Sequence, residues 1–437
     1  MGNSSKIGIF GAGWVGLVTG ACFAELGHEV VIRDIVPEKI SMLQRGEVPF
    51  HEQDVPELLR RNTERLTFTL DVNDIADCTF LFVCVDTPPT HSGDADLSRV
   101  WTVVDELPEL PGRPILVMKS TVPVGTGEKV RAGLDQRGLS HVGYVSNPEF
   151  LAEGHAVRDF MAPDRVVVGA FQAEDGEAVA GLYEGIEGPV VRADVNSSEM
   201  IKLAANAFLM TRISFINEIA NVCEATDADV VKVAEGVGLD HRLGSHFLRA
   251  GIGYGGSCFP KDSLALKQLA SNSGYHFQLL SAVIEVNELQ KRRMIGKLKR
   301  HLGVLRGKRI ALLGLAFKPG TDDMREAPSI VLASRLLAEG AEVRAWDPVA
   351  SGSLLPGGVD VVDSVLEAVQ GADAAVIVTE WPELRGLASA ETLAAMANPL
   401  IVDGRNLLDP EETRRAGFAY EGIGRPLPAA GAVPQTV

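Results

Sequence analysis

The chain has 437 residues, enough for two or three domains with a sizeable core, and its 46% hydrophobic and 23% charged residues are typical of globular proteins. The net charge of −17 argues against nucleic acid and against a membrane surface as partners, because both are anionic. The five cysteines show neither metal-ligand spacing nor pairing, so we expect reduced thiols, a cytoplasmic protein and no metal.

The first predicted elements form a nucleotide-binding unit, with a strand at residues 6–10, a helix at 17–26 and a strand at 28–34. The turn after the first strand has the pattern Gly-x-Gly-x-x-Gly and consists of Gly11, Ala12, Gly13, Trp14, Val15 and Gly16. Such glycines let the backbone approach a pyrophosphate at a helix N-terminus, and Asp34 can accept a hydrogen bond from a ribose hydroxyl. Because an acid repels a 2′-phosphate, the pattern favours NAD over NADP, a preference that the cations Arg33 and Lys39 weaken slightly.

Polar residues follow the next predicted strands, which lie at residues 79–85, 114–119 and 141–145. Ligands of open α/β sheets bind beyond the carboxyl ends of strands, so we expect Thr87, Ser120 and Thr121 to face the cofactor. For Ser120, a role in the turn is equally open. Glu149 and Glu153, four residues apart after the third strand, either share a cleft or are solvated surface acids.

A long amphipathic helix is predicted to start with the capping-box pattern Asn-Ser-Ser-Glu and to run to about Glu224. Lys202 and Asn206 are four residues apart and project from one face of it. They form a polar site on a buried helix, or the Lys202 side chain extends to solvent. A second long helix is predicted at residues 277–302, and we expect its basic cluster at 291–300 to be solvated.

A candidate nucleophile lies in the segment Gly255-Gly256-Ser257-Cys258-Phe259-Pro260-Lys261-Asp262. The two glycines leave room for a ligand beside the sulfur, and Pro260 suits the first turn of a helix. The positive end of that helix favours thiolate over thiol, Lys261 adds a cation, and Asp262 lies about one turn beyond the sulfur. We therefore favour a nucleophilic Cys258 over the alternative of a small buried hydrophobe.

From residue 306 the opening arrangement repeats, with predicted strands at 308–315, 341–347 and 372–379 and a helix at 330–337. The glycine-rich pattern is replaced by Gly-Leu-Ala-Phe-Lys-Pro, so a tight backbone site for a pyrophosphate is not expected. Lys318, Arg325 and Arg405 can instead hold an anionic ligand through their side chains. These elements predict an α/β protein with two Rossmann-like doubly wound domains joined by a long central helix.

Between residues 6 and 409 the chain closely resembles the nucleotide-sugar 6-dehydrogenases of the UDP-glucose/GDP-mannose dehydrogenase family. The motifs that carry the resemblance are residues 11–16, 120–123, 147–150, 199–202 with Asn206, 255–262 and 317–319. Phe259 matches the branch that acts on UDP-glucose, since GDP-mannose enzymes tend to carry leucine there. One departure is Gln53-Asp54, where relatives have Pro-Gly after a glutamate, so the resemblance does not imply the path of that loop.

The resemblance implies a four-electron oxidation of a sugar C6 alcohol to a carboxylate, with two NAD reduced. Cys258 matches the nucleophile, which adds to the aldehyde as a thiohemiacetal and becomes a thioester after the second hydride transfer. The other catalytic roles that it implies are oxyanion stabilisation by Lys202 and Asn206, water activation by Thr121 and Asp262, and proton transfer during thioester hydrolysis by Glu149.

The resemblance also implies two sets of binding residues. On the cofactor side these are Gly11, Gly13, Trp14, Val15, Gly16, Asp34, Lys39, Thr87, Ser120, Thr121, Glu153 and Arg325. On the substrate side they are Glu149, Phe150, Leu151, Glu153, Lys202, Asn206, Arg242, Phe247, Arg249, Tyr254, Gly255, Cys258, Phe317, Lys318 and Arg405. Arg242 matches an arginine that reaches the sugar from a neighbouring subunit, which implies a homodimer.

The expected division of the chain follows from the motifs and the resemblance together. It comprises an NAD-binding domain at residues 1–195, a central helical and dimerisation region with the cysteine loop at 196–304, a domain for the nucleotide-sugar at 305–424, and a disordered tail at 425–437.

Three alternatives stay open. The substrate is UDP-glucose by default, but TDP-glucose or another nucleotide-sugar fits the same motifs. A two-electron dehydrogenase of the 3-hydroxyacid type shares the N-terminal fold, although it needs no cysteine and lacks the C-terminal repeat. A non-catalytic NAD-binding redox sensor is the third, with Cys258 as the switch, although a sensor needs no cation such as Lys202 for an oxyanion.

Overall fold

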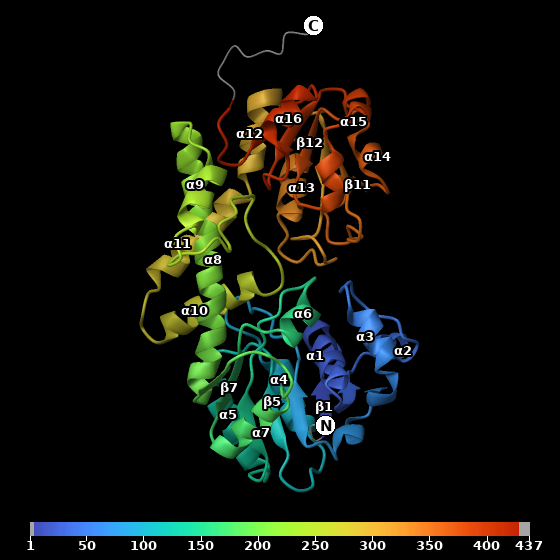
Figure 1. The fold of residues 1–437 in the computed structure, drawn as a ribbon, viewed down its shortest axis with the longest axis vertical. Helices are drawn as coiled ribbons and strands as arrows, with labels where there is room; N and C mark the ends of the chain where they lie inside the picture. Colours follow the sequence, from blue (N-terminus) through green and yellow to red (C-terminus); the bar gives the residue numbers. More distant parts are fainter. Residues whose placement is uncertain (1–3, 428–437) are drawn as a thin grey trace. The chain divides into compact units, whose positions relative to one another are not determined.

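The computed structural model describes residues 4–427, which divide into two compact units (Figure 1). Unit 1 is the N-terminal part of the chain up to Asn206 together with Lys261–His276, and unit 2 is Ala207–Pro260 together with the chain from Phe277 onward. Helix α8 (Val195–Thr226) begins in unit 1 and ends in unit 2. The predicted fold class is confirmed, because each unit contains a largely parallel sheet and a long helix joins them in sequence.

The predicted tail falls, from residue 428 on, outside the described residues. Its first residue, Arg425, is described and forms an ion pair with Asp229, at 3.2 Å. No helix within residues 4–427 has the length and apolar character needed to cross a membrane.

Unit 1 contains an eight-stranded sheet with the order β3-β2-β1-β4-β5-β6-β7-β8. Its strands are β1 (Lys6–Phe10), β2 (Glu29–Arg33), β3 (Leu66–Thr69), β4 (Phe80–Val83), β5 (Ile115–Met118), β6 (Gly143–Ser146), β7 (Val166–Ala170) and β8 (Val190–Ala193). The first six are parallel and have the order 3-2-1-4-5-6 of dinucleotide-binding folds, whereas β7 pairs antiparallel with β6.

Helices cover both faces of the sheet of unit 1. They are α1 (Trp14–Glu25), α2 (Pro37–Gln44), α3 (Val55–Arg61), α4 (Ser98–Glu106), α5 (Thr126–Gln136), α6 (Ala156–Met161) and α7 (Ala173–Gly181). Helix α1 packs against α3 and α6 over one hydrophobic cluster, and α4 packs against α5 over another (Figure 1). Because both faces are covered, β4 and β5 are buried along their whole length, which explains their continuous apolar sequences.

Unit 2 contains a six-stranded parallel sheet with the order β11-β10-β9-β12-β13-β14, so the predicted repeat is confirmed. Its strands are β9 (Arg309–Leu313), β10 (Glu342–Trp346), β11 (Val359–Val361), β12 (Ala374–Ile377), β13 (Leu400–Asp403) and β14 (Ala419–Gly422). Its further helices are α9 (Val230–Gly238), α13 (Pro328–Ala338), α14 (Val365–Val369), α15 (Ala390–Ala395) and α16 (Pro410–Arg415), and α10 (Phe259–Asn272) begins in this unit and continues in unit 1.

The single helix predicted at residues 277–302 is two helices, α11 (Gln278–Gln290) and α12 (Arg293–Leu302). Side chains near the end of α11 bind a loop of unit 2: Asn287 Oδ1 accepts from Tyr254 N at 2.8 Å, and Gln290 Nε2 donates to Gly251 O at 2.8 Å. The helical pattern of the sequence continues across the break, so periodicity alone did not reveal it.

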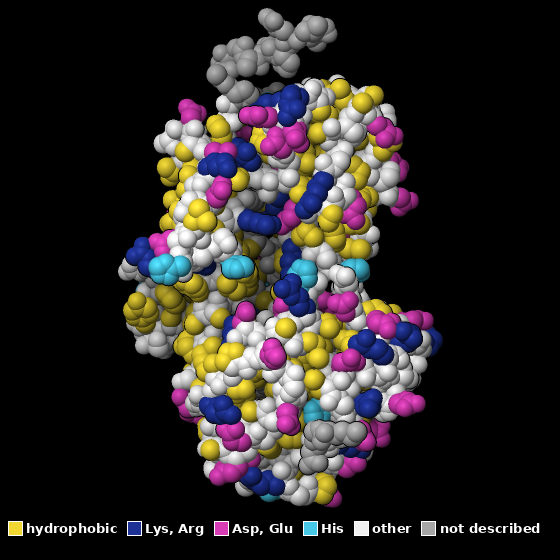
Figure 2. Space-filling model, in the orientation of Figure 1, with side chains coloured by type: hydrophobic (Ala, Val, Ile, Leu, Met, Phe, Trp, Pro, Cys, Tyr) yellow, Lys and Arg dark blue, Asp and Glu magenta, His cyan; other side chains and the backbone are white. Residues whose placement is uncertain are grey.

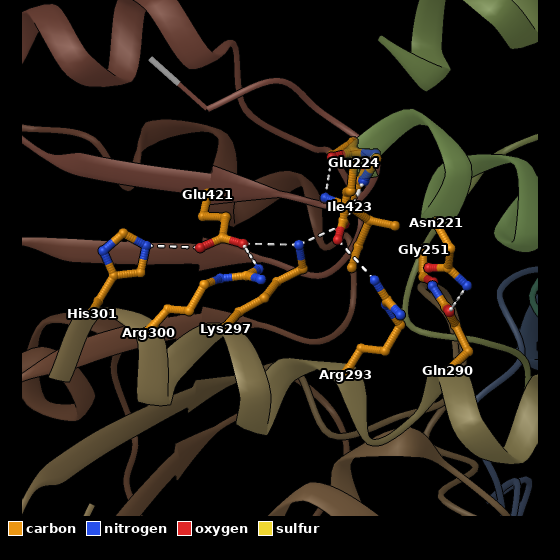
Figure 3. A network of polar contacts seen from close by, with 12 residues as sticks. Asn221, Glu224, Gly251, Gln290, Arg293, Lys297, Arg300, His301, Glu421 and Ile423 are labelled. Carbon is orange, nitrogen blue, oxygen red and sulfur yellow. Dashed lines mark hydrogen bonds and ion pairs between the residues drawn. The ribbon is translucent and has the colours of Figure 1, made fainter. Parts of the chain in front are cut away.

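The basic cluster at residues 291–300, part of which Figure 3 shows, is solvated only in part, which corrects the prediction. Lys291 and Lys297 are buried, whereas Arg292, Lys299 and Arg300 are exposed. Lys297 is 2% exposed and its Nζ contacts Glu224 at 2.6 Å and Glu421 at 3.0 Å. Glu421 points from β14 toward α12 and also accepts from Arg300 and from His301 Nε2, the latter at 2.7 Å. Lys297 and its neighbours on α12 therefore neutralise two buried or half-buried carboxylates, whereas other charges of the helix, such as Lys299, are exposed.

The predicted capping box at the start of α8 is also wrong. The helix begins at Val195, and Asp194 caps it by accepting a hydrogen bond from Ser197 N at 2.8 Å. Glu199 instead accepts from Gly125 N and Gly127 N, at 2.7 and 2.8 Å, at the start of α5. Burial raises the pKa of Glu199 to about 7, although these amides act in the opposite direction. Glu199 therefore fixes the segment that follows β5.

Candidate active site

The glycine-rich turn between β1 and α1 has the geometry of a phosphate cradle. Gly11 has a φ of +103°, and a Cβ at Gly16 would lie 1.9 Å from the carbonyl oxygen of Gly11, so both positions require glycine. Gly13 is the N-cap of α1, and a Cβ there would meet no atom within 4 Å. The backbone at Gly13 is thus open to a ligand at the positive end of α1, which fits the pyrophosphate of NAD.

Asp34 stands beside this turn at the end of β2. Its Oδ2 accepts from Ala12 N at 2.7 Å, its Oδ1 accepts from Val36 N at 3.0 Å, and Lys39 Nζ lies 3.7 Å away. Ala12 is part of the glycine-rich turn, so the ribose-binding carboxylate expected from the sequence is held against the phosphate cradle. This arrangement fits NAD.

The corresponding acid of unit 2, Asp347, is used differently. Its carboxylate accepts five hydrogen bonds within the unit, from Leu315 N, Ala316 N, Val349 N, Ala350 N and Trp381 Nε1. Five donors occupy the lone pairs that a ribose would need. The second sheet therefore does not reproduce the dinucleotide site of the first.

The polar residues after β4 and β5 line one edge of the sheet of unit 1. Thr87 Oγ1 donates to Thr121 O at 2.8 Å, which joins the two turns. Ser120 Oγ contacts Val83 O and Val85 O, at 3.1 and 2.6 Å. Of the two roles left open for Ser120, the structure shows the turn contacts.

Glu149 and Lys202 form a buried ion pair between the segment after β6 and helix α8. Lys202 Nζ lies 2.7 Å from Glu149 Oε1, and both side chains are 4% exposed. Burial alone would raise the pKa of Glu149, but the charge and hydrogen bond of Lys202 and a hydrogen bond from Leu151 N outweigh it, so the pKa lies below its ordinary value. The alternatives of a solvated Glu149 and a Lys202 extended to solvent are therefore excluded.

One turn further along α8, Asn206 contacts Asp262. Asn206 Nδ2 donates to Asp262 Oδ2 at 2.6 Å, and Lys261 Nζ donates to Asp262 Oδ1 at 2.6 Å. Asp262 is 2% exposed. A cavity of about 10 Å³ lies beside it, lined by Thr87, Pro89, Ala95, Thr121, Val122, Pro123, Leu203, Lys261, Asp262 and Ala265. Its volume is close to that of one water molecule, and Asp262 and Thr121 supply polar partners for one.

Cys258 differs from the other four cysteines in its surroundings. Cys22, Cys78, Cys84 and Cys223 are buried, and burial raises the pKa of each, to about 12 for Cys78 and Cys84. Cys258 is partly exposed and directly precedes α10. Its Sγ lies 3.6 Å from Ser257 Oγ. It is therefore the cysteine whose exposure suits a nucleophile.

The two glycines before Cys258 pack closely against another segment of unit 2. A Cβ at Gly255 would lie 2.3 Å from Glu326 O, and one at Gly256, whose φ is +88°, would lie 2.9 Å from the ring of Phe317. Both positions are filled from unit 2 itself. The glycines therefore allow the loop to pack on residues 317–326.

Three arginines of unit 2 predicted to bind a ligand, Arg242 and Arg405 for the substrate and Arg325 for the cofactor, fall into two groups. Arg405 is largely buried and donates to Val378 O, Gly253 O and Phe317 O at 2.8 to 3.2 Å, so it joins the loop before Cys258 to the Phe317-Lys318 turn. Arg242 and Arg325 have exposed side chains that pair with acids two residues earlier.

The remaining predicted residues of this unit, Phe247, Arg249 and Tyr254, lie on the same loop region. Phe247 has a φ of +60° and is 42% exposed, Arg249 is exposed, and Tyr254 is buried. Phe259 packs against Tyr254 in an edge-to-face arrangement, with ring centroids 5.8 Å apart.

Two cations near Glu149 were missed in the sequence. Lys119 is 4% exposed and its Nζ donates to Asn147 Oδ1 and Tyr183 Oη at 3.1 and 3.0 Å. The guanidinium of Arg165 stacks on the ring of Phe150, which the sequence assigned to the substrate, at 3.6 Å. The position of Lys119 at the end of an apolar strand was the one signal that pointed to it.

The fold and the site of unit 1 define an NAD-binding oxidoreductase. Models of the UDP-glucose/GDP-mannose dehydrogenase family match the chain in three parts, the NAD binding domain at residues 5–187, the central domain at 196–289 and the UDP binding domain at 311–410. The chain belongs to the UDP-glucose/GDP-mannose dehydrogenase family.

Individual relatives agree with this assignment over nearly the whole chain. The UDP-glucose 6-dehydrogenase TuaD of Bacillus subtilis is 44% identical over 96% of this chain and 93% of its own. A UDP-glucose 6-dehydrogenase of Pseudomonas aeruginosa is 45% identical over 96% of this chain and 98% of its own. The structure of a UDP-glucose dehydrogenase from Pyrobaculum islandicum superimposes with a TM-score of 0.90, with 34% identity over 97% of this chain and 98% of that one.

Membership of this family confirms the predicted resemblance, the enzymatic nature of the protein and NAD as its cofactor. It sets aside the hypotheses of a two-electron 3-hydroxyacid dehydrogenase and of a non-catalytic redox sensor.

Proposed function

We propose that this enzyme oxidises UDP-glucose at C6 to the uronic acid. The observation that carries this proposal is the 44–45% identity to UDP-glucose 6-dehydrogenases over nearly the full chain. Phe259 after the cysteine supports the UDP-glucose branch, and TDP-glucose is the competing substrate.

The proposed reaction converts the alcohol to a carboxylate with one water consumed and two hydrides removed. NAD, when bound, accepts each hydride. Cys258 adds to the aldehyde carbon as the thiolate to give a thiohemiacetal, and loss of the second hydride leaves a thioester that water hydrolyses. Lys202 and Asn206 stabilise the negative oxygen of these intermediates, because a preorganised cation and an amide donor act most strongly in a buried site.

Hydrolysis of the thioester requires a water and a group to take its proton. The small cavity lined by Thr121 and Asp262 has the size and the polar atoms to hold that water. Glu149, whose pKa lies below its ordinary value, is ionised at neutral pH and is available as the proton acceptor.

We assign NAD binding to residues 1–195, where the principal contacts are the turn at Gly13 and the side chains of Asp34, Thr87 and Glu153. We assign binding of the nucleotide-sugar to residues 305–424. Residues 196–304 then contribute the catalytic helix and cysteine loop. Lys318 contacts the nucleotide-sugar directly. Arg405 supports the same site by donating a hydrogen bond to the carbonyl oxygen of Phe317, which holds the Phe317-Lys318 turn.

The test of substrate and stoichiometry is a panel of UDP-glucose, TDP-glucose and GDP-mannose with NADH measured per sugar oxidised. We expect two NADH per UDP-glucose and a kcat/KM at least tenfold higher than for TDP-glucose. One NADH per sugar would contradict the four-electron reaction, and a preference for TDP-glucose would replace the proposed substrate.

We further propose a homodimer in the cytoplasm. Helix α8 exposes Phe208, Phe215 and Val222 at seven-residue intervals, with 51–62% of each residue exposed, so they form one apolar stripe. Figure 2 shows hydrophobic side chains over the part of the view that α8 occupies in Figure 1. Arg242 has an exposed side chain and is the residue that would reach the sugar site of the second subunit. The five cysteines are thiols and not disulfides, which suits a reducing compartment.

Light scattering after size exclusion tests the dimer. The wild type should have twice the mass of one chain, and Phe215→Glu should give monomers because it places a charge in the stripe. A Phe215→Glu protein with the wild-type mass would contradict this interface. Cell fractionation tests the location, and recovery with the membrane or secreted fraction would contradict it.

A further inference from the structure

Glu52 joins two segments of unit 1 that are far apart in sequence. Its Oε2 accepts from Trp14 Nε1 at 2.7 Å and from Gly154 N at 2.8 Å, and its Oε1 accepts from Ala156 N at 3.0 Å. The residue is 4% exposed, so these hydrogen bonds are not in competition with bulk water. Three donors and no acceptor among these partners match the bonding capacity of a carboxylate.

Each partner of Glu52 belongs to a segment assigned to the cofactor. Trp14 is the first residue of α1 and directly follows Gly13, the open position of the phosphate cradle. Gly154 follows Glu153, the carboxylate expected near the nicotinamide, and Ala156 begins α6. His155, the N-cap of α6, makes no capping bond with its side chain, so the carboxylate of Glu52 serves the start of that helix instead.

We propose that Glu52 is a positioning residue for NAD, which holds the cradle around Gly13 at a fixed spacing from the loop that carries Glu153. NAD spans both segments in the proposed function, so an error in their spacing weakens its binding even when each segment is intact. The adjoining departure, Gln53-Asp54, leaves this arrangement in place, because Gln53 is exposed and Asp54 is the N-cap of α3.

The test compares Glu52→Gln with Glu57→Gln. The glutamine side chain keeps one oxygen, but its amide N–H then faces a backbone or indole N–H, so at least one of the three hydrogen bonds is lost. Glu57 is five residues away on α3, is exposed and pairs with Arg60, so its substitution removes the same charge without touching the cofactor segments.

NADH binding, measured by fluorescence titration of the full chain, is the principal readout. We expect the Kd of Glu52→Gln for NADH to rise about tenfold to a hundredfold, as for loss of a hydrogen bond to a charged group, and that of Glu57→Gln to stay within about twofold of the wild type. The Kd for UDP, measured by calorimetry, should stay unchanged in both variants. The inference rests on the proposed function for its ligand, but NADH titration needs no turnover, so an error in the assigned sugar would not affect the result.

Hydrogen exchange gives a second readout at the site itself. In Glu52→Gln the peptide that contains Gly154 and Ala156 should exchange faster, because an amide there loses its acceptor. Glu52→Asp, which retains the charge, should restore part of the NADH affinity. Equal NADH affinity in Glu52→Gln and Glu57→Gln would overturn the proposal. A parallel loss of UDP affinity would also overturn it, because the residue would then support the fold in general.

Discussion

The ammonium of Lys202 lies 2.7 Å from Oε1 of Glu149, and 53 residues separate them in sequence. The contact fixes helix α8 against the segment that follows β6. Each charge permits the burial of the other, since either one alone would be costly where both side chains are only 4% exposed. It also defines the resting state of the site, in which Lys202, proposed to stabilise the oxyanion, and Glu149, the proposed proton acceptor, neutralise each other.

Lys202→Ala should reduce kcat about a hundredfold to a thousandfold, as for removal of an oxyanion donor. It also leaves Glu149 buried without its main partner, so the pKa of Glu149 should rise and the acid limb of the kcat profile should move to higher pH. The measurement is kcat from pH 5 to 9, with the exposed Lys129→Ala as control. A rate and profile equal to those of the control would show that Lys202 has no catalytic role.

Cys258→Ser should stop the reaction after the first hydride transfer, because a serine hydroxyl is a poor nucleophile without thiolate character. A single-turnover experiment should then give at most one NADH per UDP-glucose, against two for the wild type. Cys223→Ala, which removes a buried thiol, should still give two. Full production of the acid by Cys258→Ser would refute the covalent mechanism.

Asn206→Asp would place a second carboxylate where Asn206 Nδ2 now donates to Asp262 Oδ2 at 2.6 Å. Two carboxylates at that distance cannot both ionise easily, so the apparent pKa of the pair should rise. We expect the pH for half-maximal kcat to rise by at least about one unit, whereas Asn206→Ala should lower kcat without that shift. Identical pH profiles for the two variants would show that Asn206 and Asp262 do not interact during the reaction.

Glu421→Gln should destabilise unit 2. Burial alone would raise the pKa of Glu421, but hydrogen bonds from His301, Lys297 and Arg300 and the charge of Lys297 lower it to about 2 (Figure 3). A carboxyl whose folded pKa lies below the ordinary value of 4.5 stabilises the fold above pH 4.5, and that contribution is lost as the pH falls towards 2. At pH 7 the substitution should lower the free energy of unfolding by about 3 kcal/mol.

Urea unfolding between pH 3 and pH 7 measures this contribution. The difference between the wild type and Glu421→Gln should shrink as the pH falls below about 4.5. Glu339→Gln removes an exposed glutamate at the end of α13 that pairs with Lys299 of α12, and it should cost less than about 1 kcal/mol at every pH. A constant difference across the range would show that Glu421 acts through packing and not through its charge.

Local patterns predicted the parts of this protein whose requirements lie within short segments. The glycines at positions 11 and 16 were recognised because a positive φ and the close approach of Gly16 to the Gly11 carbonyl are properties of the turn itself. The strands and the repeat of the fold were recognised for a similar reason, since burial on both faces of a parallel sheet leaves a continuous apolar run.

The sequence could not distinguish roles that depend on a distant partner. A basic helix has the same charge pattern whether it faces water or a carboxylate such as Glu421, which lies 124 residues from Lys297. Gly255 and Gly256 also depend on distant partners. The sequence shows two small residues, but it does not show that Glu326 and Phe317 leave no space for a side chain there.

By itself, then, the sequence determined the two Rossmann-like sheets, the phosphate cradle and the identity of the chemical groups available to the enzyme. Only the tertiary structure decided which of those groups meet: Lys202 with Glu149, Asn206 with Asp262, and Glu52 with Trp14. The physical reason is that backbone conformation is set largely by neighbouring residues, whereas the burial and pairing of a charge depend on which distant segments pack around it.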